Sequence, residues 1–199
     1  MKESQKHIDK KAEILKDAIT VIQKYGYENV SIRQICKELN ITTGTFYHYF
    51  NGKNDIIAEQ FTWMDQRYLT EVKPNLTNDN ELDNILYFCN FYAEFTYKKG
   101  LSKSIEISQI KLTDNNGFYT SNHRIMKQIL LEIIQRGQNK AQIIDTVLAE
   151  DIADMILVMI RGYSFDWSRK EATYDLIYYT NLNIKLFLNG ISQNTFLYF

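Results

Sequence analysis

Proline and glycine are scarce in this 199-residue chain, and this limits the folds it can adopt. One proline and eight glycines leave few positions that would interrupt a helix. No alternating polar and apolar pattern typical of strands occurs between turn residues. The longest uninterrupted apolar run, residues 155–160, is far too short to span a membrane. The sequence therefore predicts an all-α protein with no membrane partner.

Cysteines are also scarce. Cys36 and Cys89 each lie within a helical apolar pattern and have no metal-type spacing. A disulfide between them is not expected, and a reducing compartment accounts for both. The polar residues 1–11 have no apolar segment behind them, unlike a secretion signal. We expect a soluble, cytoplasmic protein.

The motifs of common enzyme classes are missing. The chain has no G-x-S-x-G element, no glycine-rich phosphate loop, no dinucleotide fingerprint and no H-E-x-x-H. Its three histidines, His7, His48 and His123, have no metal-ligand spacing. Catalysis, a cofactor and a metal site are therefore not expected.

Residues 31–53, SIRQICKELNITTGTFYHYFNGK, contain two short helical patterns separated by a polar break. Ser31 can cap the first helix, whose apolar residues recur at helical spacing. Asn40 accepts a left-handed backbone and can end that helix in place of a glycine. Ile41 would fill the angle between the helices, and Thr42 would cap the second one. The pattern predicts a helix-turn-helix.

The second of these helices offers polar groups in place of an apolar stripe. Its anchors are Phe46, Tyr49 and Phe50, and its other side chains are hydroxyls, an imidazole and a phenol. A helix of this kind can lie in the major groove of DNA, with phosphates contacted on both sides.

The runs S-I-R-Q-I-C at 31–36 and I-T-T-G-T-F-Y-H-Y-F at 41–50, followed by Lys53, resemble the DNA-binding domain of the TetR family of bacterial transcriptional regulators. The resemblance is specific and covers residues 8–56, whereas the rest of the chain is similar to the family only in length and helical character. Two positions depart from the common pattern. Asn40 replaces the usual turn glycine, and Thr43 stands where a lysine is frequent, so one expected charge contact to DNA is missing.

The motif suggests which residues contact double-stranded operator DNA. Groove-facing or phosphate contacts are expected from Thr42, Thr43, Thr45 and Tyr47, phosphate contacts mainly from Arg33, His48 and Lys53, and close backbone approach at Gly44. Two of these have ordinary alternatives, because Tyr47 could be a core tyrosine and Lys53 a solvated helix start.

The charge distribution fits the same hypothesis. Residues 1–53 hold nine Lys and Arg against six acids, a balance of +3, and the remainder carries −4. A mildly basic end on an acidic body suits a protein that presents one end to DNA. An ordinary solvated surface could have the same uneven charge distribution by chance.

Apolar residues recur at helical spacing through most of the chain, with turn residues between the segments. The expected helices cover residues 8–25, 32–39, 42–50, 54–73, 81–99, 102–112, 121–139, 149–167 and 170–188. Residues 1–53 would form a three-helix DNA-binding domain, and residues 54–199 a helical ligand-binding and dimerisation domain.

The last two expected helices carry more apolar surface than one chain can easily cover. Apolar residues fall on several faces of residues 149–167 and 170–188. This predicts a homodimer whose two chains form a four-helix interface, as the family resemblance also implies. A larger monomeric core is the alternative.

If the family mechanism applies, a small-molecule effector binds within the helical body and lowers operator affinity by favouring one state. Aromatic residues and methionines line most apolar pockets, although core packing is the alternative for each residue taken singly. The candidates are Phe61, Met64, Tyr68, Phe88, Tyr92, Phe95, Phe118, Tyr119, Met126, Met159, Tyr163 and Trp167. A cationic ligand held by Glu94, Glu106 and Asp166 in an aromatic cage is a further hypothesis.

Together these features predict a sequence-specific DNA-binding regulator, a repressor by resemblance, that a small molecule releases from a palindromic operator. The alternative is a helical homodimer that binds a hydrophobic ligand or a partner protein without operator binding. Steeply salt-dependent binding to a palindrome near its own gene would distinguish the two.

Overall fold

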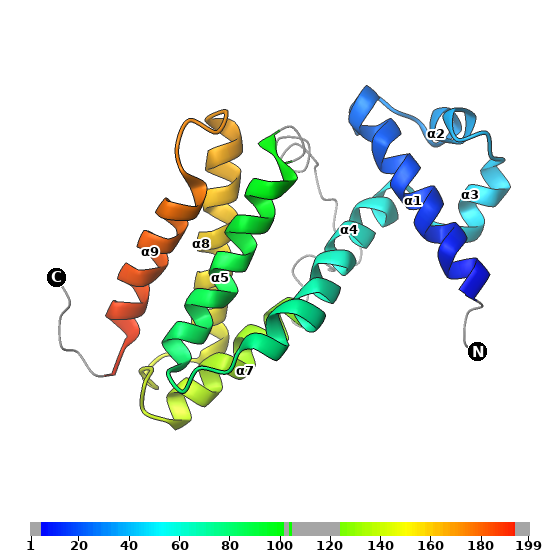
Figure 1. Cartoon of the computed structure of the whole chain (residues 1–199). Helices are drawn as coiled ribbons and strands as arrows, with labels where there is room; N and C mark the ends of the chain where they lie inside the picture. The colour runs from blue at the N-terminus through cyan, green and yellow to red at the C-terminus, as the bar shows by residue number, and fades with distance from the viewer. Residues whose placement is uncertain (1–4, 102–103, 105–123, 194–199) are drawn as a thin grey trace. The chain divides into compact units, whose positions relative to one another are not determined.

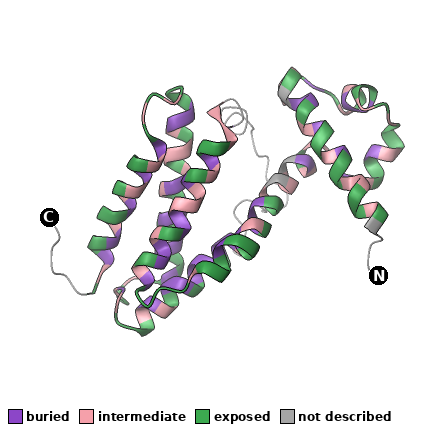
Figure 2. Cartoon of the chain, in the orientation of Figure 1, coloured by how far each residue is buried: buried purple, intermediate pink, exposed green. Residues whose placement is uncertain are grey.

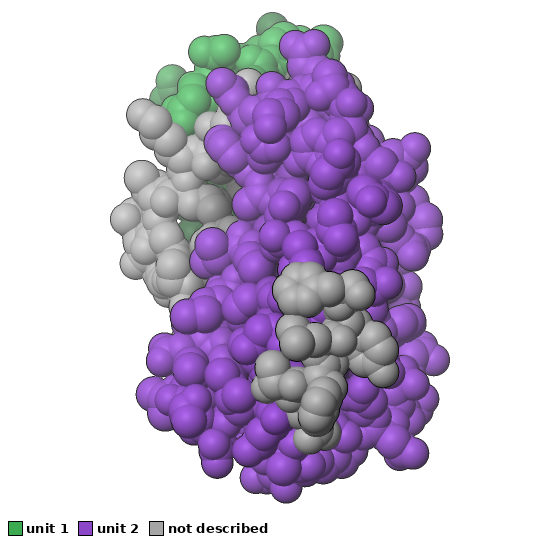
Figure 3. Space-filling model, turned by 90° about the vertical axis from the view of Figure 1, so that its left-hand side faces the viewer, with its two compact units in different colours: residues 1–63, 109–119 green, residues 64–108, 120–199 purple. Residues whose placement is uncertain are grey.

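The computed structural model describes residues 5–101, 104 and 124–193 (Figure 1). Within these residues every regular element is a helix, apart from one isolated bridge between Ile143 and Ser192. The all-α prediction is confirmed for this part of the chain. The described residues divide into two compact units, one of residues 5–63 and one that begins at residue 64 (Figure 3).

The first unit has three helices and the beginning of a fourth. They are α1 (Gln5–Tyr25), α2 (Ile32–Glu38), α3 (Thr43–Tyr49) and the first part of α4 (Lys53–Arg67). Gly26 ends α1 with a φ of 81°, a left-handed conformation that glycine adopts without strain. Each helix contributes to one apolar core, which contains Ile14, Ala18, Val21, Ile22, Val30, Ile35, Cys36, Phe46, Phe50 and Ile56.

The chain does not stop coiling after α4, but its hydrogen-bond pattern changes. A wide π-helical turn covers Tyr68–Val72, in which the amide of Lys73 donates to the carbonyl of Tyr68, five residues back. A tight 3-10 turn, Lys73–Asn75, follows. The predicted extent of this helix, to residue 73, is confirmed, whereas its regular α-helical geometry was wrong beyond Arg67.

The second unit is a bundle that also contains these two turns. Its α-helices are the end of α4, α5 (Glu81–Lys99), α7 (Ile125–Asn139), α8 (Ala149–Arg169) and α9 (Leu176–Ile191). The side chain of Asn80 caps α5, and Gly100 ends it with a φ of 89°. The helix expected over 102–112 lies, apart from Ser104, outside the described residues.

The last helix begins later than the sequence predicted. Glu171 and Ala172 have left-handed backbones, with φ of 51° and 58°, so the chain turns there instead of starting a helix at residue 170. Asp175 then caps α9 by accepting a hydrogen bond of 2.9 Å from the amide of Tyr178. In Figure 2 buried and exposed residues alternate along α9 and its neighbours, as amphipathic helices require.

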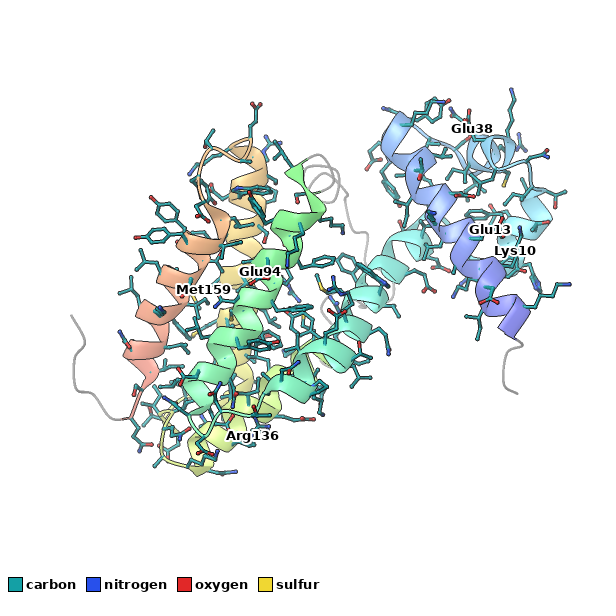
Figure 4. All side chains as sticks on the ribbon, in the orientation of Figure 1. Lys10, Glu13, Glu38, Glu94, Arg136 and Met159 are labelled. Carbon is teal, nitrogen blue, oxygen red and sulfur yellow. The ribbon has the colours of Figure 1, made fainter. Side chains whose placement is uncertain are left out.

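One buried carboxylate joins two helices of the second unit. Glu81, at the start of α5, is 1% exposed and accepts hydrogen bonds of 2.8 Å from Nε and Nη2 of Arg136 near the end of α7 (Figure 4). Lys140 and Asn84 each donate to it at 2.9 Å. Burial alone would raise the pKa of Glu81, but these hydrogen bonds lower it to about 2. Glu81 is therefore ionised and fully paired.

Candidate nucleic-acid interface

Three short-range hydrogen bonds define the starts of α2 and α3 and the turn between these helices. The Ser31 hydroxyl caps α2 by accepting from the amide of Gln34 at 3.2 Å, and Thr42 caps α3 by accepting from Thr45 at 3.0 Å. Asn40 has a φ of 52°, and the next amide, that of Ile41, donates to an α2 carbonyl. The predicted caps and the left-handed asparagine are confirmed, so the helix-turn-helix is encoded locally.

Two aromatic anchors fix the orientation of α3. Phe46 and Phe50 are 0% and 1% exposed, and their ring centroids lie 5.6 Å apart in the core of the first unit. Because both rings point inward, the opposite side of the seven-residue helix faces outward. The anchors predicted at these two positions are confirmed.

The outward side of α3 carries most of the predicted DNA contacts. Thr43, Gly44 and His48 are exposed, and Tyr47 is 56% exposed, so it is not a core tyrosine. A Cβ placed on Gly44 would meet nothing closer than the Thr42 hydroxyl at 3.7 Å, an ordinary contact. Nothing inside the unit therefore requires glycine in the first turn of this helix. A backbone that must come close to DNA is a sufficient reason for it.

Thr42 and Thr45 are less available than the sequence suggested. The two hydroxyls lie 2.9 Å apart and one donates to the other, while Thr42 also accepts from the Thr45 amide. Their polar groups are partly used in holding the start of α3. Arg33, by contrast, is exposed on α2, and its side chain can reach outward.

Lys53 makes contacts within its own unit that the sequence did not predict. Its ammonium donates to the carbonyls of Tyr27 and Val30 at 2.6 and 2.8 Å and lies 4.6 Å from the centre of the Tyr27 ring. These contacts fasten the connection between α1 and α2 to the start of α4. The interpretation of Lys53 as a solvated helix start is wrong, and only one of its three N–H groups is left for a phosphate.

The basic residues of α1 are partly neutralised by neighbouring acids. Lys10 donates to Glu13 at 2.9 Å (Figure 4), and Lys11 bonds to Glu59. The exposed Lys10–Glu13 pair contributes little to stability, so Lys10 can exchange its carboxylate for a phosphate at small cost, whereas Lys11 and Glu59 are partly buried.

One contributor was missed in the sequence. His7, in the first turns of α1, lies against the last turn of α3, with ring centroids 4.7 Å from Tyr49 and 5.2 Å from His48. This contact steadies the end of α3 that carries His48. A pairing between residues so far apart in the chain has no signal in a single sequence.

Comparisons with known proteins agree with this geometry. A family profile described as bacterial regulatory proteins of the tetR family matches residues 14–59. These residues include α2, α3, most of α1 and the beginning of α4. The "Fatty acid metabolism regulator protein" of Bacillus subtilis is 25% identical over 191 residues, which are 90% of this chain and 94% of that protein. These matches support the TetR family.

Two further comparisons differ in how much of the chain they cover. The "HTH-type transcriptional regulator BetI" of Vibrio campbellii is 31% identical over 68 residues, which are 34% of each chain. The crystal structure of FadR from Bacillus subtilis in complex with stearoyl-CoA has a TM-score of 0.74 at 19% identity and covers 90% of this chain and 98% of its own. At that identity the likeness shows a shared fold and nothing more.

In the helical body, most candidate ligand residues come together. Met64, Tyr68, Phe88 and Met126 lie in one buried cluster, and Tyr92 and Phe95 pack against it. Burial raises the pKa of the Tyr68 phenol well above its usual value, and its hydroxyl donates to the carbonyl of Phe88 at 3.1 Å. Phe118 and Tyr119 lie outside the described residues.

Two other ligand candidates have a different role. Trp167 is 3% exposed and donates from Nε1 to the carbonyl of Tyr174 at 3.0 Å, and the carbonyl of Tyr163 accepts from the Tyr174 hydroxyl at 3.2 Å. Neither belongs to the buried cluster that contains Tyr68. Both hold the turn between α8 and α9, a packing role that the sequence pattern did not distinguish from ligand contact.

The proposed cage for a cationic ligand does not form among the described residues. Glu94 is exposed (Figure 4) and pairs with Lys98 at 3.0 Å, and Asp166 pairs with Lys170 at 3.0 Å. Glu106 lies outside the described part of the chain. Both described carboxylates are thus already matched by a lysine one helical turn away.

Apolar side chains remain exposed along α8 and α9. On α8, Met155, Val158 and Phe165 are 50–67% exposed, and Gly162 lies on the same stripe. On α9, Leu182 and Leu186 are 41% and 57% exposed. A surface of this kind is typical of a contact with another protein chain.

Among the helices described, none is long and apolar enough to cross a membrane. The described residues also contain no group of three or more His, Cys, Asp or Glu side chains that could hold a metal ion.

Proposed function

We propose that this chain is a homodimeric transcriptional regulator that leaves a palindromic DNA operator when a long-chain acyl thioester binds its helical body. The observation that carries the DNA-binding part is the outward side of α3. It presents Thr43, Gly44, Tyr47 and His48 on a helix whose buried anchors, Phe46 and Phe50, fix its orientation. A helix held in this way can enter a major groove as a rigid unit.

The apolar stripes of α8 and α9 support the homodimer. A two-fold axis would place each stripe against its copy and make a four-helix interface. Two α3 helices then engage two half-sites, and the second half-site adds affinity without a further association cost. Each α3 offers few charges, so a single copy would bind weakly.

The choice of ligand class rests on the full-length relatives. The Bacillus subtilis fatty acid metabolism regulator matches along nearly the whole chain, whereas BetI matches over only 34% of it, too little to indicate a ligand for the helical body. The FadR structure with the same overall fold holds stearoyl-CoA. A body rich in buried aromatic and aliphatic side chains suits an acyl chain, and the two described acids proposed for a cationic ligand are already paired.

The test begins with selection of bound fragments from the genome of the source organism. Fluorescence anisotropy on the selected operator should show a steep loss of affinity with salt and a strong preference over scrambled DNA. Stearoyl-CoA should weaken this binding, whereas free CoA and stearate at equal concentration should not. Failure to bind any genomic fragment would favour the helical dimer without operator binding. Binding that ignores stearoyl-CoA would remove only the proposed ligand class.

A further inference from the structure

The wide turn Tyr68–Val72 is an unusual element in an important place. It continues α4, whose first part, Lys53 to Trp63, belongs to the DNA-binding unit, while the turn itself lies in the helical body (Figure 1). Helical turns with hydrogen bonds to the fifth residue back accommodate one extra residue within an α-helix. They are rare, and those that occur are frequently at functional sites.

The turn is required by the packing on its two sides. Met64 and Asp65 precede it, Tyr68 and Val72 lie in it, and all four are at most 8% exposed. In an unbroken α-helix each residue of register corresponds to about 100° of rotation and 1.5 Å of translation. Closing the turn without changing the chain length would therefore carry Met64 and Asp65 out of their present positions, or move Val72 out of its own.

Strong contacts hold the segment before the turn. Asp65 accepts from Nε and Nη2 of Arg124 at 3.0 and 2.9 Å and from the amide of Met126 at 3.2 Å. Both members of the ion pair are about 5% exposed. A buried bidentate pair of this kind has few intermediate positions, since a partial shift leaves a buried charge unpaired.

Tyr68 holds the turn itself. Its ring centroid lies 4.5 Å from that of Phe88 and 5.2 Å from that of Phe91, and its hydroxyl donates to the Phe88 carbonyl on α5. Tyr68 and Phe88 are both among the residues proposed to contact the ligand. An acyl chain that displaces the Tyr68 ring would therefore remove the main contact that keeps the turn wide.

We propose that the Tyr68–Val72 turn is a two-register joint, and that a ligand in the body acts by converting it to α-helix and moving α4 by one residue of register. The proposal rests on the proposed function for its ligand. Binding energy at Tyr68 is thereby converted into a discrete rotation of the helix that leads to the DNA-binding unit, because the buried pair at Asp65 has no stable intermediate position.

Deletion of Thr70, an exposed residue of the turn, tests the joint in the full-length protein. The deletion removes the extra residue, so a regular α-helix can form while both flanking segments keep their present positions. The variant should bind stearoyl-CoA but release operator DNA less than about twofold, where the wild type changes affinity by about tenfold or more. Thr70→Ala, which keeps the chain length, should respond like the wild type. A deletion variant that still responds fully overturns the proposal.

A second measurement separates this proposal from the choice of ligand. Amide hydrogen exchange without any ligand should be about tenfold or more slower at residues 68–73 in the deletion variant than in the wild type, because an α-helix protects amides that an opening turn exposes. Equal protection would overturn the joint even if stearoyl-CoA proves to be the wrong ligand.

Tyr68→Phe covers the case in which the deletion prevents folding. It keeps the ring and the chain length but removes the hydroxyl that bonds to Phe88. Exchange at residues 68–73 should become several-fold faster than in the wild type. Unchanged exchange would contradict the role given to Tyr68 and overturn the proposal.

Discussion

At the scale of single residues, Lys53 and Gly44 of the DNA-binding unit have roles that differ from those their residue types suggest. Lys53, one of the charged residues of the motif, uses two of its donors on carbonyls of its own unit. Gly44, which has no side chain, is required by no internal contact, because a Cβ would fit there easily. The lysine thus contributes to the fold, and the glycine leaves room for an external partner.

Replacing Gly44 by alanine separates folding from DNA binding. We expect Gly44→Ala to leave the free energy of unfolding unchanged or to raise it by up to about 1 kcal/mol, since alanine is the better helix former. Operator affinity should fall by about tenfold or more because the added methyl group holds the α3 backbone away from DNA. Urea unfolding and anisotropy measure the two effects. Unchanged affinity would mean that the first turn of α3 does not approach the DNA.

Lys53→Met should show the opposite pattern. Loss of hydrogen bonds from a charged donor to two carbonyls should lower the free energy of unfolding by about 1–3 kcal/mol. Operator binding should weaken, but the slope of log affinity against log salt should stay nearly constant. Arg33→Ala is the matched comparison, expected to keep stability and to reduce that slope by about one unit, the value for one lost phosphate contact. If the slope for Lys53→Met also fell by a full unit, Lys53 would be a phosphate contact after all.

At the scale of helices, buried polar groups decide how neighbouring elements are joined. The ionised Glu81 ties the start of α5 to the end of α7 through Arg136 and Lys140. Because the folded-state pKa of Glu81, about 2, lies below the ordinary value of 4.5, its ionisation stabilises the fold above pH 4.5. This contribution is lost as the pH falls through about 2.

Glu81→Gln should therefore alter the acid dependence of stability. At neutral pH the variant should lose about 3 kcal/mol, the value of a pKa shift of this size, and the difference from the wild type should shrink steadily between about pH 5 and pH 2. Urea unfolding at a series of pH values measures it. A difference that is constant with pH would show that Glu81 acts by shape alone.

At the scale of the whole molecule, the proposed function depends on a second copy of the chain. The α8 stripe contains Gly162, which lies between the exposed Val158 and Phe165 and where an added Cβ would meet no other atom within 4 Å. A glycine in mid-helix costs about 1 kcal/mol relative to alanine, so a close approach by another helix is a physical reason for its presence.

Gly162→Leu should consequently weaken the homodimer. Sedimentation at micromolar concentration should show mostly monomer, and operator affinity should fall with the loss of the second half-site. Glu150→Leu, an exposed position on another side of α8, should leave the association unchanged. A dimer that survives in Gly162→Leu would place the interface elsewhere.

Much of the candidate site could be predicted from the sequence, because its defining interactions are short in range. The caps at Ser31 and Thr42 and the left-handed Asn40 depend on residues at most four positions away, so the helix-turn-helix is encoded in the local order of residues. The same holds for the ends of α1 and α5 at Gly26 and Gly100.

Tertiary structure decided what depends on distant partners. Lys53 bonds to carbonyls more than twenty residues away, and Trp167 became part of the α8–α9 turn instead of the buried cluster. The wide turn at Tyr68 arises because Asp65 and Val72 must both face inward, toward Arg124 and the core. Residue type and spacing determine which groups are available to bond, but only the packed chain decides which of the competing partners is close enough to be used.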